Sequence, residues 1–288
     1  MTVSIQSEID RKREALLAWF RRVPSVAVAF SGGVDSSVVM AAAWRVLRDR
    51  AVAVTADSPS VPRAELEEAR RLAEHLGIRH IVITTDEFTR DEYRSNDGRR
   101  CYYCKDELYS RIHALLPQLK AEVICSGANL DDGNDYRPGL RAAAEHHVRH
   151  PLQEVGLRKV EVRELARQWQ LPVWDKPASP CLASRIAPGV AVTPERTARI
   201  ELAEAFLRAH GLREFRVRVH DGELARIEVP ETEIHCLVAP DFRKVLAQHF
   251  RALGFQFVTL DLEGFRSGRF NEVIPLEIRQ SFGTGGTT

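Results

Sequence analysis

The sequence lacks a strong charge of either sign, a long hydrophobic run and a secretory signal. Its 41 Lys and Arg residues are balanced by 40 Asp and Glu residues, for a net charge of +1. This balance does not indicate a strongly basic surface for nucleic acid. No apolar run approaches the ~20 residues that span a bilayer, and the first ten residues lack the basic and apolar regions of a signal peptide. We therefore expect a cytoplasmic protein.

Cysteine is also scarce, with 5 residues among 288. An odd count without a secretory signal argues against a disulfide framework. Cys125 lies in an apolar run and Cys236 in a helical stretch, so both are expected to be small buried residues. Cys101, Cys104 and Cys181 lie in different surroundings and are candidates for chemistry.

Hydrophobic residues make up 44% of the chain and charged residues 28%, as in soluble globular proteins. Strand-like and helix-like runs alternate, which predicts an α/β fold with a parallel sheet, helices on both faces and ligands beyond the carboxyl ends of the strands. The expected strands are Ser25–Phe30, Ala51–Ala56, His80–Thr84 and Ala121–Cys125. The expected helices are Ile5–Arg22, Ser36–Leu47, Arg63–Leu76 and Lys105–Leu116.

The proline-rich stretch Pro172–Gly189 blocks long helices and is expected to be the seam between two domains. We expect residues 1–188 to form the α/β domain, 189–275 a smaller α+β domain, ferredoxin-like in topology, and 276–288 a disordered tail. The smaller domain is expected to contain, in order, a helix with Thr193 as its N-cap, two strands, a helix and a strand. These elements are Pro194–Gly211, Glu214–His220, Glu223–Val229, Glu231–Leu253 and Phe255–Leu260.

Residues 31–37 read Ser-Gly-Gly-Val-Asp-Ser-Ser, between a strand-like and a helix-like run. Adjacent glycines let the backbone turn tightly, hydroxyl groups add donors, and the following helix points its N–H groups at an anion. The spacing is not that of a Walker loop. The residues expected to hold pyrophosphate are Ser31, Gly32, Gly33, Ser36 and Ser37.

This string resembles the loop of the PP-loop ATP pyrophosphatases, which cleave ATP between its α and β phosphates. Asp35 lies within it, and its carboxylate is suited to ligate Mg²⁺ that also binds the phosphates. Asp57 follows the second expected strand, where adenosine contacts are expected. The sequence therefore predicts a site for Mg-ATP at this edge of the sheet.

Four further stretches are Arg100–Tyr109, Ser126–Gly139, His150–Lys159 and Trp174–Arg185. In this order, with the phosphate loop, they closely resemble the LarE family. The resemblance implies a sulfur transferase that uses ATP to adenylate the carboxylates of pyridinium-3,5-biscarboxylic acid mononucleotide. Sulfur then replaces AMP, which yields thiocarboxylates for the nickel-pincer cofactor of lactate racemase. It also implies a homo-oligomer, a trimer or hexamer.

The resemblance assigns further roles to polar residues. Gly127 and Asn129 are expected to reach the nucleotide. The residues expected to arrange the acyl-phosphate side of the site are Asp132, Asp135 and Arg137. Guanidinium groups suit a mononucleotide phosphate, and the expected substrate-binding arginines are Arg185, Arg216 and Arg218. Lys176 and Arg185 are expected to favour the thiolate of Cys181, whereas Glu201 and Glu204 are interpreted as ordinary helix-surface residues.

Cys181 is the expected sulfur residue. In family members with this cysteine alone, its own sulfur is given up and dehydroalanine remains. This chain adds Cys101 and Cys104, a spacing compatible with zinc, a redox pair or an iron–sulfur cluster. Two cysteines do not complete a structural zinc site. The resemblance favours a four-iron four-sulfur cluster on Cys101, Cys104 and Cys181, with one iron open to bind hydrosulfide, over the sacrificial route.

Three other functions remain open. A PP-loop tRNA thiolase uses the same adenylation, but the near-neutral charge and the lack of a recognisable RNA-binding module count against it. An ammonia-using synthetase would leave Cys181 without a role. A nucleotide-binding module without catalysis would bind ATP and release no pyrophosphate.

Overall fold

The computed structural model describes residues 5–134, 137–266, 270 and 273–282, and the chain divides into two compact units. Unit 1 comprises residues 1–87, 101–179 and 280–288, and unit 2 comprises 88–100 and 180–279. The division after Ser179 lies within the expected seam but before the expected boundary at residue 188. The reason is that the segment after Pro180 is bonded to unit 2: the N–H of Ala187 donates to the carbonyl of Val219 at 2.9 Å.

The early segment 88–100 belongs to unit 2 for a similar reason. The side-chain amide of the buried Asn96 donates to three carbonyl groups of the later segment, at 2.8–3.3 Å: those of Ile186, Ala187 and Val190. The carbonyl of Asn96 in turn accepts from the N–H of Gly189 at 2.9 Å. A stretch expected to be a polar loop of the first domain is thus part of the second unit.

Unit 1 contains a parallel sheet in the order β3-β2-β1-β4, which confirms the predicted α/β class. Its strands are β1 (Val26–Ala29), β2 (Ala51–Asp57), β3 (His80–Thr84) and β4 (Val123–Cys125). Its helices are α1 (Ile5–Arg21), α2 (Val34–Leu47), α3 (Arg63–His75), α5 (Arg100–Leu119, with Arg100 itself in unit 2), α6 (Pro138–Glu145), α7 (Pro151–Glu154) and α8 (Lys159–Gln168).

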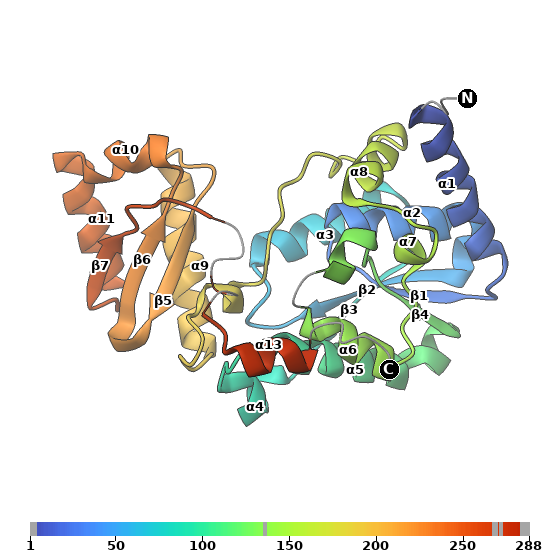
Figure 1. The fold of residues 1–288 in the computed structure, drawn as a ribbon, viewed down its shortest axis with the longest axis horizontal. Coiled ribbons are helices and arrows are strands. Elements are labelled where there is room, and N and C mark those ends of the chain that lie inside the picture. The colour runs from blue at the N-terminus through green and yellow to red at the C-terminus, as the bar shows by residue number, and fades with distance from the viewer. Residues whose placement is uncertain (1–4, 135–136, 267–269, 271–272, 283–288) are drawn as a thin grey trace. The chain divides into compact units, whose positions relative to one another are not determined.

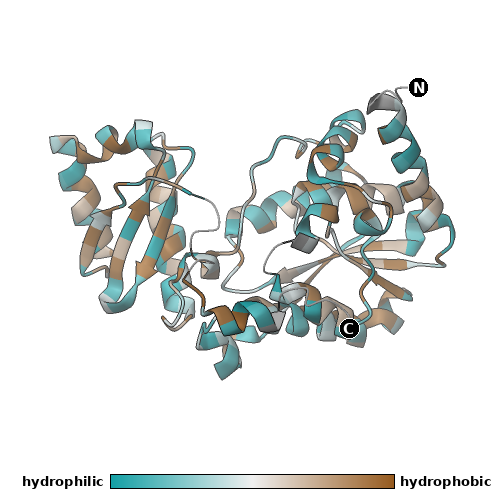
Figure 2. Ribbon diagram, viewed as in Figure 1, coloured by the Kyte–Doolittle hydropathy of each residue, from teal (hydrophilic) through white to brown (hydrophobic). Residues whose placement is uncertain are grey.

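The two faces of this sheet bury different sets of side chains, because successive residues of a strand point to opposite faces. Val26 and Val28 of β1 pack into a core with α1, α2, α3, α7 and α8. Ala27 packs on the other face, with α5 and α6. Figure 1 shows these helices on the two sides of the strands, and Figure 2 shows polar and apolar residues alternating along α1.

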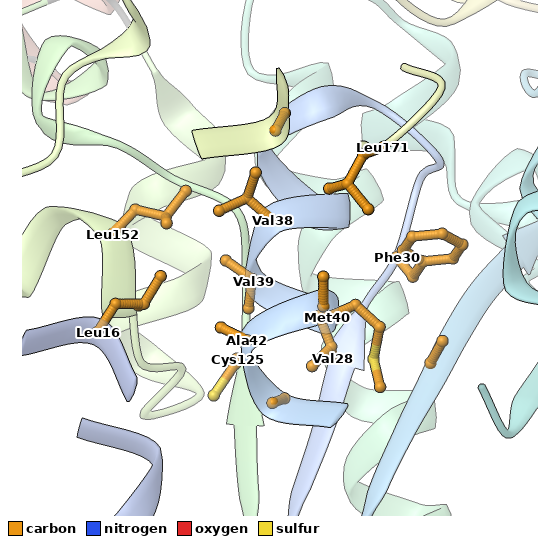
Figure 3. Close-up of a cluster of buried hydrophobic side chains, with 14 of the residues drawn as sticks. Leu16, Val28, Phe30, Val38, Val39, Met40, Ala42, Cys125, Leu152 and Leu171 are labelled. Atoms are coloured by element: carbon orange, nitrogen blue, oxygen red, sulfur yellow. The ribbon is translucent and has the colours of Figure 1, made fainter. Parts of the chain in front are cut away.

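Helix α2 lies at the centre of the larger core, which explains the apolar run Val38–Trp44 within it. Val38, Val39 and Met40 are 0% exposed, and Figure 3 shows them among side chains of the surrounding elements. These neighbours include Leu16 from α1, Val28 and Phe30 from the β1 segment, Cys125 from β4 and Leu152 from α7. Packing on all sides fixes the start of α2, and therefore the phosphate loop before it.

Helix α5 begins earlier than the predicted Lys105. The carboxylate of Asp97 accepts from the N–H of Arg99 at 3.0 Å, a local turn that leads into the helix. Cys101 and Cys104 therefore lie on its first turns instead of in the preceding loop. The polar stretch before them contains a 3-10 turn at Glu87–Thr89 and the short helix α4 (Asp91–Arg94).

Unit 2 contains α9 (Pro194–Ala209), β5 (Arg216–His220), β6 (Leu224–Glu228), α10 (Ile234–Val238), α11 (Pro240–Ala252) and β7 (Phe257–Leu260). The hydroxyl of Thr193 accepts from the N–H of Arg196 at 3.3 Å, the predicted N-cap. The sheet order is β5-β6-β7, with β5 and β6 antiparallel but β6 and β7 parallel. The described residues therefore do not form the all-antiparallel ferredoxin-like sheet, because β7 pairs directly beside β6.

Two predicted elements near the end of the chain differ from the structure. The expected helix Glu231–Leu253 is divided because Pro240 starts a new helix. Leu276–Phe282 forms helix α13 where a disordered tail was expected; residues 283–288 lie outside the described part. Within the described residues, no helix has the length and apolar character needed to cross a membrane.

Candidate active site

The phosphate loop is held by its own hydroxyl groups. Ser31 receives the N–H of Gly33 on its Oγ at 3.3 Å. The hydroxyls of Ser36 and Ser37 donate to the carbonyl of Gly33 at 3.1 and 2.8 Å. These hydrogen bonds define the shape of the loop between β1 and the N-terminus of α2. That terminus supplies the anion-attracting end of a helix dipole.

At two positions of the site, neighbouring atoms leave no room for a side chain larger than that of glycine. Gly32 has a φ of +71°, and a Cβ there would lie 3.0 Å from the Cβ of Ala69 on α3. A Cβ on Gly127 would lie only 2.6 Å from the backbone N of Ser36. The loop after β4 therefore presses directly on the first turn of α2, which brings Gly127 to the phosphate loop, while its contact with the nucleotide stays a prediction.

Asp35 is contacted by a cation and by an amide. The ammonium of Lys159, the first residue of α8, donates to its Oδ2 atom, and the side-chain amide of Asn129 donates to its Oδ1 atom at 3.2 Å. The backbone N–H of Lys159 donates to Asp131 at 2.8 Å, which fixes the start of α8. The residues Asp35, Asn129 and Lys159 thus converge beside the phosphate loop. Lys159 has no individual role in the sequence-based prediction.

The acids after β4 differ in what they contact. Asp132 accepts from the backbone N–H of Asn129 at 3.0 Å and pairs with Arg137 at 2.7 Å. It therefore shapes the turn that presents Asn129. Arg137 is exposed, with a side chain 51% accessible. Asp135 lies outside the described residues.

Behind this turn, His150 supports the loop after β4. Its Nδ1 atom lies 2.8 Å from the hydroxyl of Ser126. Burial lowers the pKa of His150, so the neutral ring is favoured. A neutral imidazole can share a hydrogen bond with the hydroxyl without placing a buried positive charge below the loop.

Asp57 ends β2 on the same carboxyl edge of the sheet as the phosphate loop. Its carboxylate pairs with Arg63 at 2.5 Å. Arg63 also donates to the carbonyl of Ser58 at 2.6 Å, so the pair closes the turn between β2 and α3. The adenosine contact expected for Asp57 stays a prediction.

Cys101 and Cys104 lie three residues apart on α5, so their side chains share one side of the helix. Cys101 is exposed and Cys104 is half-buried. Close packing on α6 fixes these turns, because a Cβ on Gly139 would lie 2.9 Å from Cγ of Lys105. Among the described residues, no cluster of three or more His, Cys, Asp or Glu side chains is arranged to hold a metal.

Cys181 belongs to unit 2, where it precedes a short 3-10 turn, Leu182–Arg185, and is half-buried. The two cations expected to favour its thiolate are engaged elsewhere. Lys176 pairs with two carboxylates of α3 at 2.6–2.7 Å. Arg185 pairs with Glu204 at 3.1 Å, and both side chains are less than 10% exposed. Arg185 also donates to the carbonyl of Cys181 at 3.0 Å, and the effect of Lys176 and Arg185 on the thiolate of Cys181 stays a prediction.

The other two substrate-binding candidates also have internal partners. Arg218 pairs with Glu228 at 2.9 Å, with side chains 8% and 0% exposed. Arg216 has its guanidinium 5.0 Å from the ring centroid of Phe265, and burial lowers its pKa. Glu204 is 5% exposed, so its interpretation as a helix-surface residue is wrong. Glu204 lies at helical spacing from the buried Ile200 and Leu207, and this period could have marked it as a core position, whereas Glu201 is half-buried.

Comparisons with known proteins identify the family of this chain. A family model described as asparagine synthase matches residues 18–95, which include the phosphate loop. The chain is 38% identical to a pyridinium-3,5-bisthiocarboxylic acid mononucleotide synthase of Lactiplantibacillus plantarum, over 91% of this chain and 95% of that protein. An uncharacterized protein of Synechocystis sp. is 42% identical over 92% of this chain and 99% of its own. A tRNA-specific 2-thiouridylase of Azorhizobium caulinodans is 32% identical, but over only 54% of this chain. This chain is therefore an enzyme of the LarE family, the PP-loop family of the Lactiplantibacillus plantarum synthase.

Proposed function

We propose that this enzyme uses ATP to convert the carboxylates of pyridinium-3,5-biscarboxylic acid mononucleotide into thiocarboxylates. A carboxylate oxygen attacks the α-phosphorus of ATP, the bond to the β-phosphate oxygen breaks, and pyrophosphate leaves. Sulfur then attacks the carbonyl carbon of the acyl-adenylate, and AMP leaves with the bonding electron pair. A second round treats the other carboxylate. The product would serve a nickel-pincer cofactor such as that of lactate racemase.

The observation that carries this proposal is the convergence of Asp35, Asn129 and Lys159 beside a preformed phosphate loop, in a chain so similar to a named synthase. The N–H and hydroxyl groups of the loop would bind the pyrophosphate as it departs. Lys159 would supply a positive charge where negative charge develops, which is the main source of rate enhancement in phosphoryl chemistry.

The donor set at Asp35 fits a magnesium ion. Its carboxylate is 23% exposed and lies at the loop, and an oxygen ligand shared with phosphates is the usual protein contribution to Mg²⁺ binding. Asp35 would hold the ion, which would neutralise charge on the phosphates. Asn129 would keep the carboxylate oriented through its amide.

For the sulfur, we propose that Cys101, Cys104 and Cys181 hold a four-iron four-sulfur cluster, with donation of the Cys181 sulfur itself as the alternative. Two accessible thiols one helical turn apart on α5 fit thiolate ligation. The cluster would offer an open iron for hydrosulfide. Anaerobic purification with iron and sulfide analysis, followed by intact mass after turnover, separates the routes: bound iron with unchanged mass supports the cluster, and loss of one H₂S supports sacrifice.

Substrate-dependent release of pyrophosphate tests the adenylation step. Wild-type enzyme given Mg-ATP and the pyridinium dicarboxylate should release pyrophosphate and AMP, whereas Asp35→Asn should release little. Asp49→Asn, an exposed carboxylate on the 3-10 turn after α2, is the matched control and should behave as wild type. If the wild-type enzyme releases no pyrophosphate with this substrate, the proposed function is wrong.

A homo-oligomer, trimeric or hexameric, is part of the same proposal, and sedimentation of the purified protein tests it.

Arg216 and Arg218 are proposed to receive the phosphate of the substrate after rearrangement of their internal partners. Arg216→Gln, which keeps the pair of Arg218 with Glu228, tests that contact: the KM for the pyridinium substrate should rise in this variant.

A further inference from the structure

The backbone around Cys181 is held by arginine side chains of the same unit. Arg185 donates from Nη1 to the carbonyl oxygens of Pro180 and Cys181, the latter at 3.0 Å. The carbonyl of Cys181 also accepts from the hydroxyl of Ser184 at 2.7 Å. Two donor groups thus make three hydrogen bonds to the two carbonyl groups that flank the Cα atom of Cys181.

Two more guanidinium groups hold the residues that follow. Arg218 donates to the carbonyl of Ser184 at 3.1 Å, and Arg100 donates to the carbonyl of Ala183 at 2.7 Å. Arg100 is oriented by the side-chain carbonyl of Asn96, also at 2.7 Å. The segment from Pro180 to Ser184 therefore has little freedom to change its path within unit 2.

The carboxylate of Glu204 orients Arg185. Its two oxygens receive Nε and Nη2 of the guanidinium at 3.1 and 3.2 Å, a forked arrangement that defines direction as well as distance. The Oε1 atom also accepts from the backbone N–H of Val217 on β5 at 3.2 Å. A continuous series of bonds therefore runs from the sheet through Glu204 and Arg185 to the backbone of Cys181.

We propose that Glu204 is a positioning residue for sulfur transfer, which acts through Arg185 to hold Cys181, as cluster ligand or as sulfur donor, where sulfur can reach the activated carboxyl carbon. This inference rests on the proposed function, in which Cys181 supplies or holds the sulfur. Displacement of AMP requires the attacking atom within roughly 3–3.5 Å of the carbon. A side chain reaches such a distance reproducibly only if its backbone is fixed, and these bonds fix it.

The test uses full-length Glu204→Gln, which keeps the volume and one acceptor oxygen but removes the charge and the forked pairing. Arg185→Lys is the second variant, because lysine keeps the charge and lacks the fork. Glu223→Gln is the matched control: Glu223 pairs with Arg196 and Arg199, both on α9 like Glu204, and has no bond to the Cys181 segment among those described.

Three quantities are measured for each variant: pyrophosphate release, thiocarboxylate formed in a single turnover, and the rate at which iodoacetamide alkylates Cys181 in iron-free protein, identified by peptide mass. For Glu204→Gln we expect unchanged pyrophosphate release, thiocarboxylate formation slower by about ten- to a hundredfold, and faster alkylation as the loosened segment exposes the thiol. For Arg185→Lys we expect the same changes in thiocarboxylate formation and alkylation; its pyrophosphate release is not used, because Arg185 is also a candidate for substrate binding. Glu223→Gln should match wild type in all three.

Slower thiocarboxylate formation together with faster alkylation of Cys181 indicates that the variant has lost the positioning of this residue. A general loss of stability would lower pyrophosphate release as well. The inference is overturned if thiocarboxylate formation and alkylation both stay at wild-type rates, or if pyrophosphate release and thiocarboxylate formation fall together. Absence of pyrophosphate release from wild-type enzyme is a separate result, which rejects the proposed function and not the bonding of the Cys181 segment.

Discussion

The ammonium group of Lys159 donates to the carboxylate of Asp35, although 124 residues separate them in the sequence. Asp35 lies in the phosphate loop and Lys159 begins α8, so the pair joins two helix N-termini at one point. The N–H of Lys159 is itself bonded to Asp131, so its side chain, and not the backbone of α8, carries the positive charge to the phosphate loop.

Lys159→Met is expected to lower the rate of pyrophosphate release by roughly 100- to 1000-fold, because a preorganised charge beside the departing phosphates is lost. The affinity for ATP should fall as well. Steady-state pyrophosphate release measures the effect, with Lys244→Met, an exposed lysine of α11, as the matched control. A rate within twofold of wild type would exclude Lys159 from the reaction.

Gly127→Ala is expected to destabilise the enzyme by about 1–3 kcal/mol, because the new Cβ would overlap the backbone N of Ser36 and the loop must move. ATP binding should weaken in parallel. Thermal unfolding with and without Mg-ATP measures both effects. Gly133→Ala is the control, since a Cβ there meets only the flexible amide of Gln153 at 3.5 Å. Equal behaviour of the two variants would mean that the phosphate loop adapts freely.

Stability should fall as the pH drops from 7 toward 5.5. Burial lowers the pKa of His150 in the folded protein, so the unfolded chain takes up a proton at higher pH than the folded chain does. The free energy of unfolding is therefore constant above the unfolded pKa of about 6.5 and decreases below it, by at most about 1.4 kcal/mol per pH unit for this group. His80 and His220 shift in the same direction for the same reason.

His150→Gln should flatten this pH dependence, since glutamine does not titrate. The midpoint of urea unfolding between pH 5.5 and 7.5 measures the slope. His75→Gln, which replaces an exposed histidine of α3, should retain the wild-type slope. A His150→Gln profile as steep as that of wild type would show that other groups cause the loss.

Cys101→Ser and Cys104→Ser should each abolish or strongly reduce bound iron and acid-labile sulfide in anaerobically purified protein, because each removes a proposed thiolate ligand. Cys236→Ser should not, because Cys236 on α10 is not one of the three proposed ligands, although it is exposed instead of buried as predicted. Iron content equal in all three variants and wild type would contradict ligation by the α5 cysteines.

Local features of the sequence predicted most of the fold correctly. The strands of unit 1 are short apolar runs followed by turn residues, and the helices between them predict a parallel sheet, whereas the strand order β3-β2-β1-β4 was not predicted. The phosphate loop and the Thr193 cap depend on neighbouring residues alone, so their chemistry is visible in the sequence. The start of α5 was missed because the turn at Asp97 depends on a side-chain bond that no periodicity reports.

Long-range pairings were not predictable in the same way. Lys159 and Asp35, or Glu204 and Arg185, carry ordinary surface residue types, and only the fold brings them together. A sequence pattern also cannot separate a buried arginine from an exposed one. The guanidinium groups of Arg185 and Arg218 were expected to face a phosphate, whereas the structure pairs them with buried carboxylates.

Unit 2 is formed by two separate segments of the chain, residues 88–100 and 180–279, so no single break in the chain divides the protein into its two units. A polypeptide starting at Pro180 would lack Asn96, and the buried carbonyls of Ile186, Ala187 and Val190 would lose their shared donor. Isolated expression of the later half is thus expected to yield a frayed product, and a protease nick between residues 88 and 100 should leave the pieces associated. Genetic dissection of this enzyme therefore has to carry the early segment along, as a co-expressed peptide or by rejoining the ends in a new order.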